Sequence, residues 1–166
     1  MFVDDQGGYP RDSETDLKIF LGADHRGFEL KNKVKEILSQ QGFKVEDLGT
    51  FQPEPPCDYP RISYHLARRV AKTKNARGIL VCMTGIGHSI AANKVLGAYA
   101  ALCYNKEAAL LSREHNNANI LVVGAKFVSP TEMLEIIDVW LKTKFAGGRH
   151  LRRVKQIKEI EKKICG

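Results

Sequence analysis

The segment from Cys82 to Ser89, with the sequence CMTGIGHS, contains the residues of this chain that are best suited to chemistry. The cysteine ends an apolar run, and Gly85 and Gly87 follow in a turn that leads into a helix-like segment. A thiol that faces a helix N-terminus is favoured as the thiolate, which can act as a base or a nucleophile. The backbone N–H groups of such a loop can bind a small anion or a developing oxyanion. The alternative is a buried structural cysteine before a plain turn.

This segment also argues against a nucleotide site. It does not match the GxGxxG pattern of dinucleotide-binding loops, and it lacks the lysine of a P-loop. A small-anion or oxyanion site therefore fits the two glycines better than a nucleotide site does.

Two further segments place polar side chains beside apolar runs. Asp24 and His25 directly follow the first run, and His115 and Asn116 lie near the end of a helix-like segment. Each pair could bind a ligand, yet each also has an ordinary structural explanation. Asp24 is a suitable helix N-cap beside an exposed His25, and histidine and asparagine are common where helices end. Spacing alone does not decide between these interpretations.

Basic side chains are concentrated near the C-terminus. The formal net charge is +7, and much of the excess lies in residues 142–163, where apolar residues recur at helical spacing. Arg149 and Arg153 would share one helical face there and could clamp a phosphate group. The charge suits an anionic substrate or a nucleic acid, but a solvated basic helix face is the simpler interpretation of the tail. We therefore expect no nucleic-acid partner.

The elements that must position these residues follow from an alternation of short apolar runs and longer helix-like segments. The runs cover residues 17–23, 44–49, 78–83, 98–103 and 119–125. The helix-like segments include residues 27–42, 58–72 and 129–144, with Gly42 as a stop and Asp58 and Ser129 as N-caps. This alternation predicts an α/β fold with a parallel sheet covered by helices on both faces. Ligands in such folds bind at the carboxyl ends of the strands, where Asp24 and Cys82 lie.

Length and composition favour one domain that carries an extension. The chain has 166 residues, of which we expect 1–16 to be a flexible N-terminal extension and 17–166 to be the domain. No apolar run approaches the roughly 20 residues that a membrane span needs, and the N-terminus has no apolar segment typical of a secretion signal. The four cysteines form no CxxC pair, which argues against a zinc or thioredoxin-type motif. We expect reduced thiols, a cytoplasmic location and no membrane partner.

Taken together, several segments closely resemble the family of ribose-5-phosphate isomerase B and galactose-6-phosphate isomerase. The matching segments are GADHRGFELK, DYP, GILVCMTGIGHSIAANK, LSREHNNANILVVGAK and FAGGRHLRRV, spread over about 140 residues. The resemblance implies a Rossmann-like αβα sandwich with a five-stranded parallel sheet. It also implies a homodimer or a dimer of dimers with each site at the subunit interface, and no metal or organic cofactor. The implied reaction interconverts ribose 5-phosphate and ribulose 5-phosphate through an enediolate.

The resemblance also assigns roles to individual residues. Cys82 matches the base that moves the proton between C1 and C2, His115 matches the acid that opens the sugar ring, and Thr84 accompanies the oxyanion loop. The positions matched to substrate binding are Asp24, His25, Met83, Gly85, Ile86, Gly87, Asn116, Lys126, Arg149 and Arg153. A positioned base with donors aimed at the developing negative oxygen is what abstraction of a proton beside a carbonyl requires.

Three positions depart from the family pattern. Met83 replaces a glycine, Lys126 replaces an arginine, and His88 stands where an apolar residue is common. If that glycine is needed for a positive φ or for close approach of substrate, Met83 changes which sugar fits. The alternatives are therefore an isomerase of another sugar phosphate, such as allose or galactose 6-phosphate, or a homologue that binds a sugar phosphate without turnover. We expect His88 to be a polar residue of the first helical turn and not a catalyst.

Overall fold

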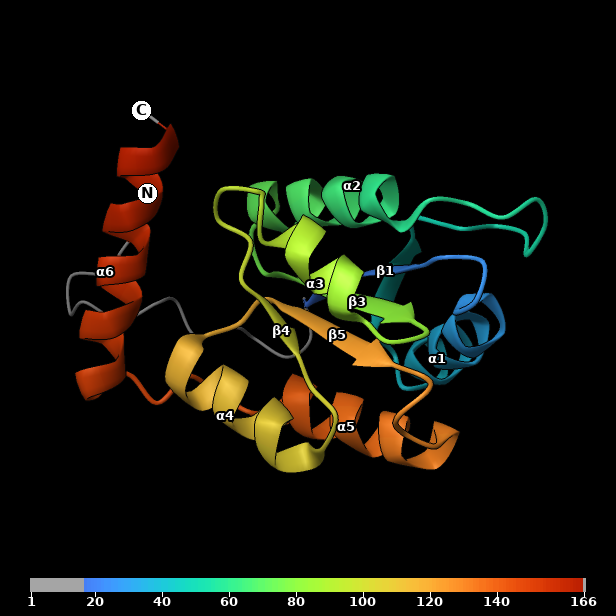
Figure 1. Cartoon of the computed structure of the whole chain (residues 1–166). Coiled ribbons are helices and arrows are strands. Elements are labelled where there is room, and N and C mark those ends of the chain that lie inside the picture. Colours follow the sequence, from blue (N-terminus) through green and yellow to red (C-terminus); the bar gives the residue numbers. More distant parts are fainter. Residues whose placement is uncertain (1–16, 166) are drawn as a thin grey trace.

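A five-stranded parallel sheet with the strand order β2-β1-β3-β5-β4 runs through the middle of the molecule (Figure 1). The computed structural model describes residues 17–165, so the extension predicted over residues 1–16 lies outside the described residues. The strands are β1 (Lys18–Ala23), β2 (Lys44–Asp47), β3 (Ala76–Cys82), β4 (Ala100–Leu102) and β5 (Ile120–Gly124). The helices are α1 (Phe28–Gln40), α2 (Tyr59–Lys72), α3 (Ile86–Ala92), α4 (Lys106–Asn116), α5 (Pro130–Lys142) and α6 (Gly148–Cys165).

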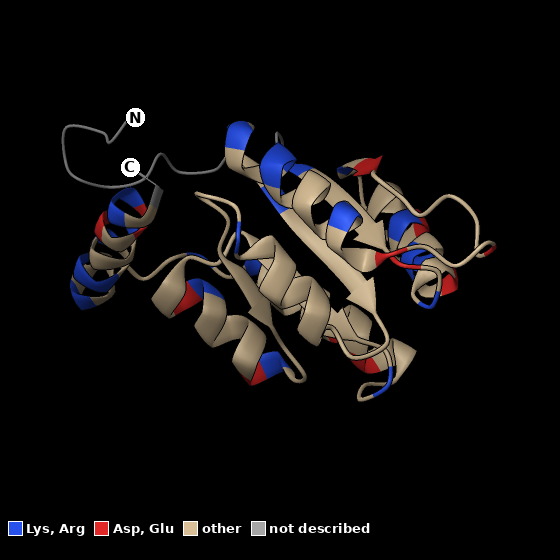
Figure 2. Cartoon of the chain, turned by 45° about the horizontal axis from the view of Figure 1, so that its top comes forward, with Lys and Arg blue, Asp and Glu red and all other residues tan. Residues whose placement is uncertain are grey.

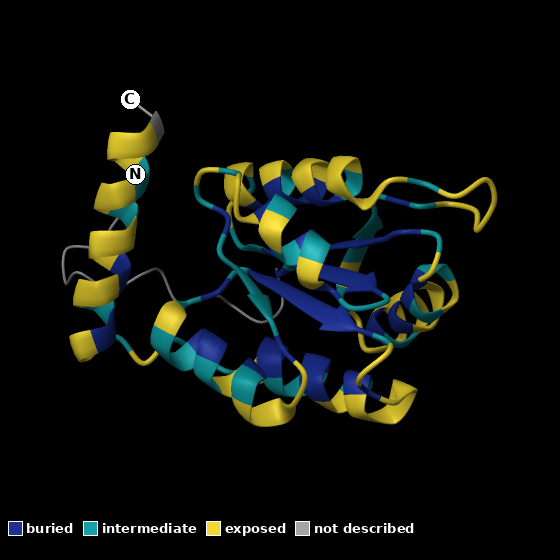
Figure 3. Cartoon of the chain, in the orientation of Figure 1, coloured by how far each residue is buried: buried dark blue, intermediate teal, exposed yellow. Residues whose placement is uncertain are grey.

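Helices cover both faces of the sheet. The helices α2 and α3 pack on one face, and α1, α4 and α5 cover the other (Figure 1). Successive residues of a strand point to opposite faces, so Ile19 and Leu21 enter the core under α1 and α5, whereas Phe20 enters the core under α2. The central strands are consequently buried along almost their whole length (Figure 3). The predicted α/β fold with a five-stranded parallel sheet is confirmed.

The helix ends follow the sequence signals with one exception. Ser129 forms a capping box with Glu132 at the start of α5, and Gly42 adopts a φ of 87° just after α1. Asp58 occupies the N-cap position of α2, but its side chain makes no capping hydrogen bond. The sequence therefore predicts the N-cap residue of α2 correctly, but the expected hydrogen bond between the Asp58 side chain and the helix backbone is absent.

The last helix, α6, lies beside α4 at one end of the molecule (Figure 1). Its Glu161 carboxylate accepts hydrogen bonds from the Gly97 N–H and the Tyr99 hydroxyl, at 3.2 and 2.7 Å. Its arginines and most of its lysines are exposed, as the sequence predicts, and Figure 2 shows where these residues lie along the helix. Of its predicted apolar stripe Val154 is buried, but Ile157 and Ile160 are exposed, so part of this apolar face is uncovered in one chain. None of the helices in the described part of the chain is long and apolar enough to cross a membrane.

A buried lysine ties α1 to the end of β2 and to the segment that follows it. The Lys31 ammonium donates to both carboxylate oxygens of Asp47 at 2.8 Å and to the carbonyl oxygen of Thr50 at 2.6 Å. Thr50 in turn donates its N–H to the carbonyl of Ala23, the last residue of β1. Since a buried charge is tolerated only when it is paired, this contact fixes the chain next to the end of β1.

Removing the partner of Lys31 is expected to destabilise the protein strongly. Asp47→Ala leaves an uncompensated buried ammonium and should lower the free energy of unfolding by about 3–5 kcal/mol. Lys35 also contacts Asp47, at 3.4 Å, but is 46% exposed, so the control Lys35→Ala should cost less than about 1 kcal/mol. Urea unfolding followed by circular dichroism measures both changes. Equal losses in the two variants would contradict this account of Lys31.

Candidate active site

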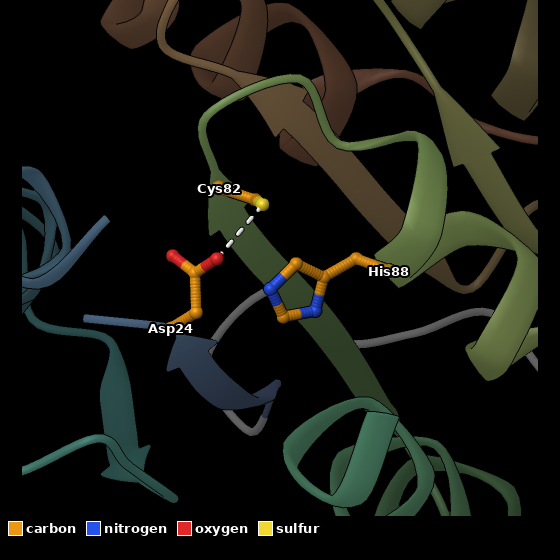
Figure 4. A group of neighbouring side chains, drawn as sticks. All are labelled: Asp24, Cys82 and His88. Carbon is orange, nitrogen blue, oxygen red and sulfur yellow. Dashed lines mark hydrogen bonds between the residues drawn. The ribbon is translucent and has the colours of Figure 1, made fainter. Parts of the chain in front are cut away.

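The pairing of β1 with β3 brings Asp24 and Cys82 together at the carboxyl edge of the sheet. In the register of the two parallel strands Ala23 lies opposite Val81, so the residue that follows each of them points into the same region. The Cys82 thiol donates to Asp24 Oδ2, with Sγ and Oδ2 separated by 3.1 Å (Figure 4). Both residues are buried, with 8% of Cys82 and 6% of Asp24 exposed.

The backbone of the turn before α1 holds the Asp24 carboxylate in place. Asp24 Oδ1 accepts the N–H groups of Arg26 and Gly27 at 3.1 and 3.0 Å, which leaves Oδ2 for Cys82. The N-cap position itself belongs to Gly27, so Asp24 supports the turn without being the cap. A Cβ at Gly27 would lie 2.4 Å from the carbonyl oxygen of Val81, so this close approach requires glycine.

Two glycines shape the loop after Cys82. Gly85 caps α3 with a φ of 81°, and a Cβ there would meet Leu102 at 2.5 Å. A Cβ at Gly124 would lie 2.3 Å from the carbonyl oxygen of Thr84, so the end of β5 passes directly against the loop. The loop is further tied to that strand by the Lys126 N–H, which donates to the Met83 carbonyl at 2.8 Å. The expected strand-to-helix turn is therefore held tightly at its backbone.

Met83 fits this loop without backbone strain. Among residues 17–165 the non-glycine residues with positive φ are Asn75 and Asn117, so Met83 has a conformation open to any side chain. The side chain is half-buried directly beside Cys82 in the sequence. A need for positive φ is therefore not a reason to expect glycine here, and any effect of Met83 must come from its side-chain volume.

The surroundings of Cys82 favour the protonated thiol. Burial raises the pKa of Cys82, and the hydrogen bond to Asp24 and the negative charge of Asp24 raise it further. Hydrogen bonds from the backbone N–H groups of Gly85 and Thr84 lower the pKa, but they do not outweigh these effects. The sequence-based expectation of a thiolate stabilised by the helix N-terminus is wrong for the free protein, because that expectation omitted burial and Asp24.

His88, which the sequence predicts only as a polar residue of the first helical turn, lies beside Asp24 and Cys82. It is fully buried in the first turns of α3, and its Nδ1 lies 2.6 Å from the Ser63 hydroxyl oxygen. Figure 4 shows its ring directed toward Asp24 and Cys82. Burial lowers the pKa of His88 to about 4, although the charge of Asp24 opposes this, so the ring is neutral at pH 7. Its helical spacing from Ala92, which is also buried, was the available signal that His88 faces inward.

The other residues predicted at this edge surround the same strand ends. His25 is half-buried, with Nδ1 3.3 Å from the carbonyl oxygen of Cys57. Thr84 is half-buried, and its carbonyl accepts the Tyr104 hydroxyl at 3.1 Å. Ile86 and Lys126 are exposed, so they are free to meet a molecule from solution.

Gly87 packs against α2. A Cβ at Gly87 would come within 2.5 Å of the ring of Tyr59, so the start of α3 approaches that ring closely. The role of this glycine in one chain is therefore to allow helix packing.

The remaining predicted residues lie at the opposite edge of the sheet. His115 and Asn116 end α4 shortly before β5 begins, whereas Cys82 lies opposite Gly124 at the end of β5. The four residue steps of β5 alone span about 13 Å at about 3.3 Å per residue. One chain therefore does not bring Cys82 and His115 together.

His115 belongs to a second cluster with the start of α6. Its ring stacks on the ring of His150, with centroids 4.0 Å apart and an interplanar angle of 7°. Burial lowers the pKa of His150, and the charges of His115, Arg149 and Arg153 lower it further. Arg149 and Arg153 are both exposed, so this cluster presents positive charge to solvent.

Comparison with known proteins identifies the family. The family model described as ribose/galactose isomerase matches residues 19–157. The chain belongs to this family. A relative from Escherichia coli K12 named ribose-5-phosphate isomerase B is 42% identical over 146 residues, which cover 88% of this chain and 97% of the relative.

Solved structures agree with this assignment. A ribose-5-phosphate isomerase B from Clostridium thermocellum superposes with a TM-score of 0.85 at 48% identity, covering 89% of this chain and 99% of that one. The enzyme from Mycoplasma genitalium, solved with bound ribulose 5-phosphate, superposes with a TM-score of 0.86 at 41% identity, covering 89% and 98%. The resemblance on which the sequence analysis relied is confirmed.

The Asp24 contact makes a specific prediction about thiol reactivity. Asp24→Asn removes a negative charge that raises the Cys82 pKa, so more thiolate forms at neutral pH and alkylation of Cys82 by iodoacetamide should speed up. In the wild-type protein the Cys82 rate should keep rising above pH 9, because the thiol deprotonates only above its ordinary range. Peptide mass mapping over a pH series measures both rates. Cys103, whose pKa burial raises to about 11, is the internal control and should not respond to Asp24→Asn.

Proposed function

We propose that this protein is an aldose–ketose isomerase that interconverts ribose 5-phosphate and ribulose 5-phosphate. The observation that carries the proposal is the Cys82 thiol, placed between the Asp24 carboxylate and the N–H groups of Thr84 and Gly85 in a chain of this family. The reaction consists of proton transfers next to a carbonyl, which a base and an oxyanion site can perform without a cofactor.

In the proposed mechanism His115 protonates the ring oxygen of the cyclic sugar while the C1 hydroxyl loses its proton to water, which breaks the bond from C1 to the ring oxygen and gives the free aldehyde. The thiol proton of Cys82 passes to Asp24 Oδ2, which lies 3.1 Å away, and the thiolate then removes the proton from C2. The negative charge that develops on the sugar oxygen is stabilised by N–H groups of the loop over residues 83–87. The hydroxyl proton on O2 moves to O1, and Cys82 delivers the carbon-derived proton to C1, which leaves a carbonyl at C2 and completes the ketose. Asp24 then returns its proton to the Cys82 sulfur.

The raised pKa of Cys82 suits this sequence of events. A thiol that stays protonated in the free protein is protected from alkylation and oxidation until substrate occupies the site. Proton transfer to Asp24 then forms a base only where the reacting carbon is present. Because such a base requires a reduced thiol, we also propose that the protein works in the cytoplasm.

The proposed site requires two copies of the chain. Cys82 and His115 lie at opposite edges of the sheet, with Arg149 and Arg153 beside His115. We propose a homodimer, which can pair into a dimer of dimers, in which one copy supplies the base and its partner supplies the ring-opening acid and the phosphate-binding arginines. The exposed apolar side chains of α3 (Ile86, Ile90) and α6 (Ile157, Ile160) support such an interface.

Mixing two inactive variants tests the function and the shared site together. Cys82→Ala and His115→Ala should each abolish most isomerisation of ribose 5-phosphate, because each removes a proton-transfer group. After subunit exchange at equal concentrations, half of the dimers are mixed and each has one intact site, so about a quarter of wild-type activity should return. A coupled assay for ribulose 5-phosphate measures it.

The outcomes separate the two parts of this proposal. If both single variants are inactive and mixing restores nothing, the base and the acid come from the same chain and the shared site is wrong. If Cys82→Ala keeps wild-type turnover, Cys82 is not the base. The matched control mixes Cys82→Ala with Cys82→Ser, which should stay inactive because no site then has an intact thiol.

Met83 favours a second candidate, in which the same chemistry acts on another sugar phosphate. Its half-buried side chain lies next to Cys82 and costs the backbone nothing, so its effect is on the volume of the site. Met83→Gly should change kcat/KM for ribose 5-phosphate relative to allose 6-phosphate by about 10-fold or more, since small changes in pocket volume discriminate by that order. A kinetic panel with these two substrates measures the ratio. An unchanged ratio would show that Met83 does not select the substrate.

A further inference from the structure

The side chains of Asp24, Cys82 and His88 form a compact group of three different metal-ligand types. Each offers one ligand atom, and these atoms all lie within 4.8 Å of one another. The residues come from the end of β1, the end of β3 and the first turns of α3, and all three are buried. Figure 4 shows the carboxylate, the sulfur and one edge of the imidazole facing a common point.

His88 directs an unsatisfied atom into this group. Among the described residues no hydrogen-bond partner lies near Nε2, although the side chain is fully buried. When the Ser63 hydroxyl donates its one proton to the Tyr59 carbonyl at 2.9 Å, its oxygen accepts from Nδ1 of His88 at 2.6 Å, and we assign this tautomer. This tautomer leaves a bare lone pair on Nε2. A buried lone pair without a partner is costly, which points to a ligand that it receives.

The other two ligands are held in the same way. Asp24 Oδ1 is occupied by the N–H groups of Arg26 and Gly27, so Oδ2 faces the group. Cys82 Sγ already lies 3.1 Å from Oδ2, and ligand atoms around a tetrahedral zinc ion lie about 3 to 4 Å apart. Small side-chain movements therefore suffice to close the three atoms around one ion. Hydrogen bonds that orient metal ligands from outside are typical of functional metal sites.

We propose that Asp24, Cys82 and His88 bind one zinc ion between them. Sulfur, imidazole nitrogen and carboxylate oxygen are the donors that zinc prefers, whereas calcium and magnesium require oxygen donors. On binding, the thiol proton leaves to solvent, a Zn–S bond forms, and no electron is transferred. The three side chains fill three of the four positions around a tetrahedral zinc ion, which leaves the fourth for water.

Zinc at this position is an inhibitor and not a cofactor. A sulfur bound to zinc cannot remove a proton from the sugar, and Oδ2 of Asp24 cannot accept one. This consequence rests on the proposed role of Cys82 as the base, while the binding of zinc itself does not. We therefore expect bound zinc to hold the protein in an inactive form, and a chelator to restore activity by removing the zinc.

The first experiment measures binding without reference to activity. Equilibrium dialysis of the full-length, metal-free protein against zinc should give one ion per chain, which EDTA removes. Cobalt in place of zinc should give a thiolate-to-cobalt charge-transfer absorption, and Cys82→Ala should abolish that absorption. His88→Ala should weaken zinc binding at least about tenfold. His65→Ala is the matched control, because His65 is an exposed histidine on α2, and it should leave binding unchanged.

The outcomes are decisive in either direction. No binding by the wild-type protein, or equal binding by wild type and His88→Ala, overturns the proposal. If His88→Ala does not fold, as judged by circular dichroism, His88→Leu replaces it, since leucine fills the cavity without a metal-binding atom. The cobalt absorption needs no variant at position 88, and its absence from the wild-type protein overturns the site as well.

Isomerase assays then separate this proposal from the proposed function. Zinc should inhibit the wild-type protein, EDTA should restore its activity, and His88→Leu should need at least about tenfold more zinc for half inhibition. Activity that zinc does not affect, in a protein that binds zinc through Cys82, contradicts Cys82 as the base and leaves the metal site standing. Zinc inhibition that His88→Leu does not weaken overturns the metal site and leaves the isomerase standing.

Discussion

The parallel register of β1 and β3 is the constraint on which the rest of this structure depends. Because Ala23 lies opposite Val81, the residues that follow them lie together at the carboxyl edge of the sheet, and Asp24 Oδ2 lies 3.1 Å from Cys82 Sγ. The turn before α1, the loop before α3 and the end of β5 are all packed against these strand ends through glycines that no other residue could replace without displacement. The chemistry of the cysteine is set by this pairing and not by the loop alone.

Burial and the charge of Asp24 act on the pKa of Cys82 in the opposite direction to the backbone N–H groups. The balance of these effects decides whether Cys82 is a thiol or a thiolate in the free protein. The N–H groups of Thr84 and Gly85 lower the thiol pKa, yet burial and Asp24 raise it more. A carboxylate that stabilises the protonated thiol is also the group best placed to receive its proton. One contact therefore explains both the low reactivity of the resting thiol and the proposed route to the base.

The distribution of the other functional residues over two edges of the sheet follows from the topology. In a parallel α/β fold every helix returns the chain to the amino edge, so residues at the end of α4 lie a full strand length from residues at the end of β3. A site that uses both edges needs a second copy of the chain. In the proposed homodimer, the exposed arginines of α6 and its uncovered isoleucines would contact the partner.

The sequence by itself determined the α/β class, the five strands, the helix ends at Gly42 and Ser129, and the family. These depend on local periodicity and on residues close together in the chain, which sequence patterns record directly. Only the tertiary structure decided that the Cys82 thiol donates a hydrogen bond to Asp24 and that Nε2 of His88, which has no hydrogen-bond partner among the described residues, lies beside them. It also decided that the backbone of Met83 is unstrained. Each of these results depends on burial, or on contacts between residues that are distant in the chain, and a pKa or an unpaired lone pair arises from that environment and not from residue type.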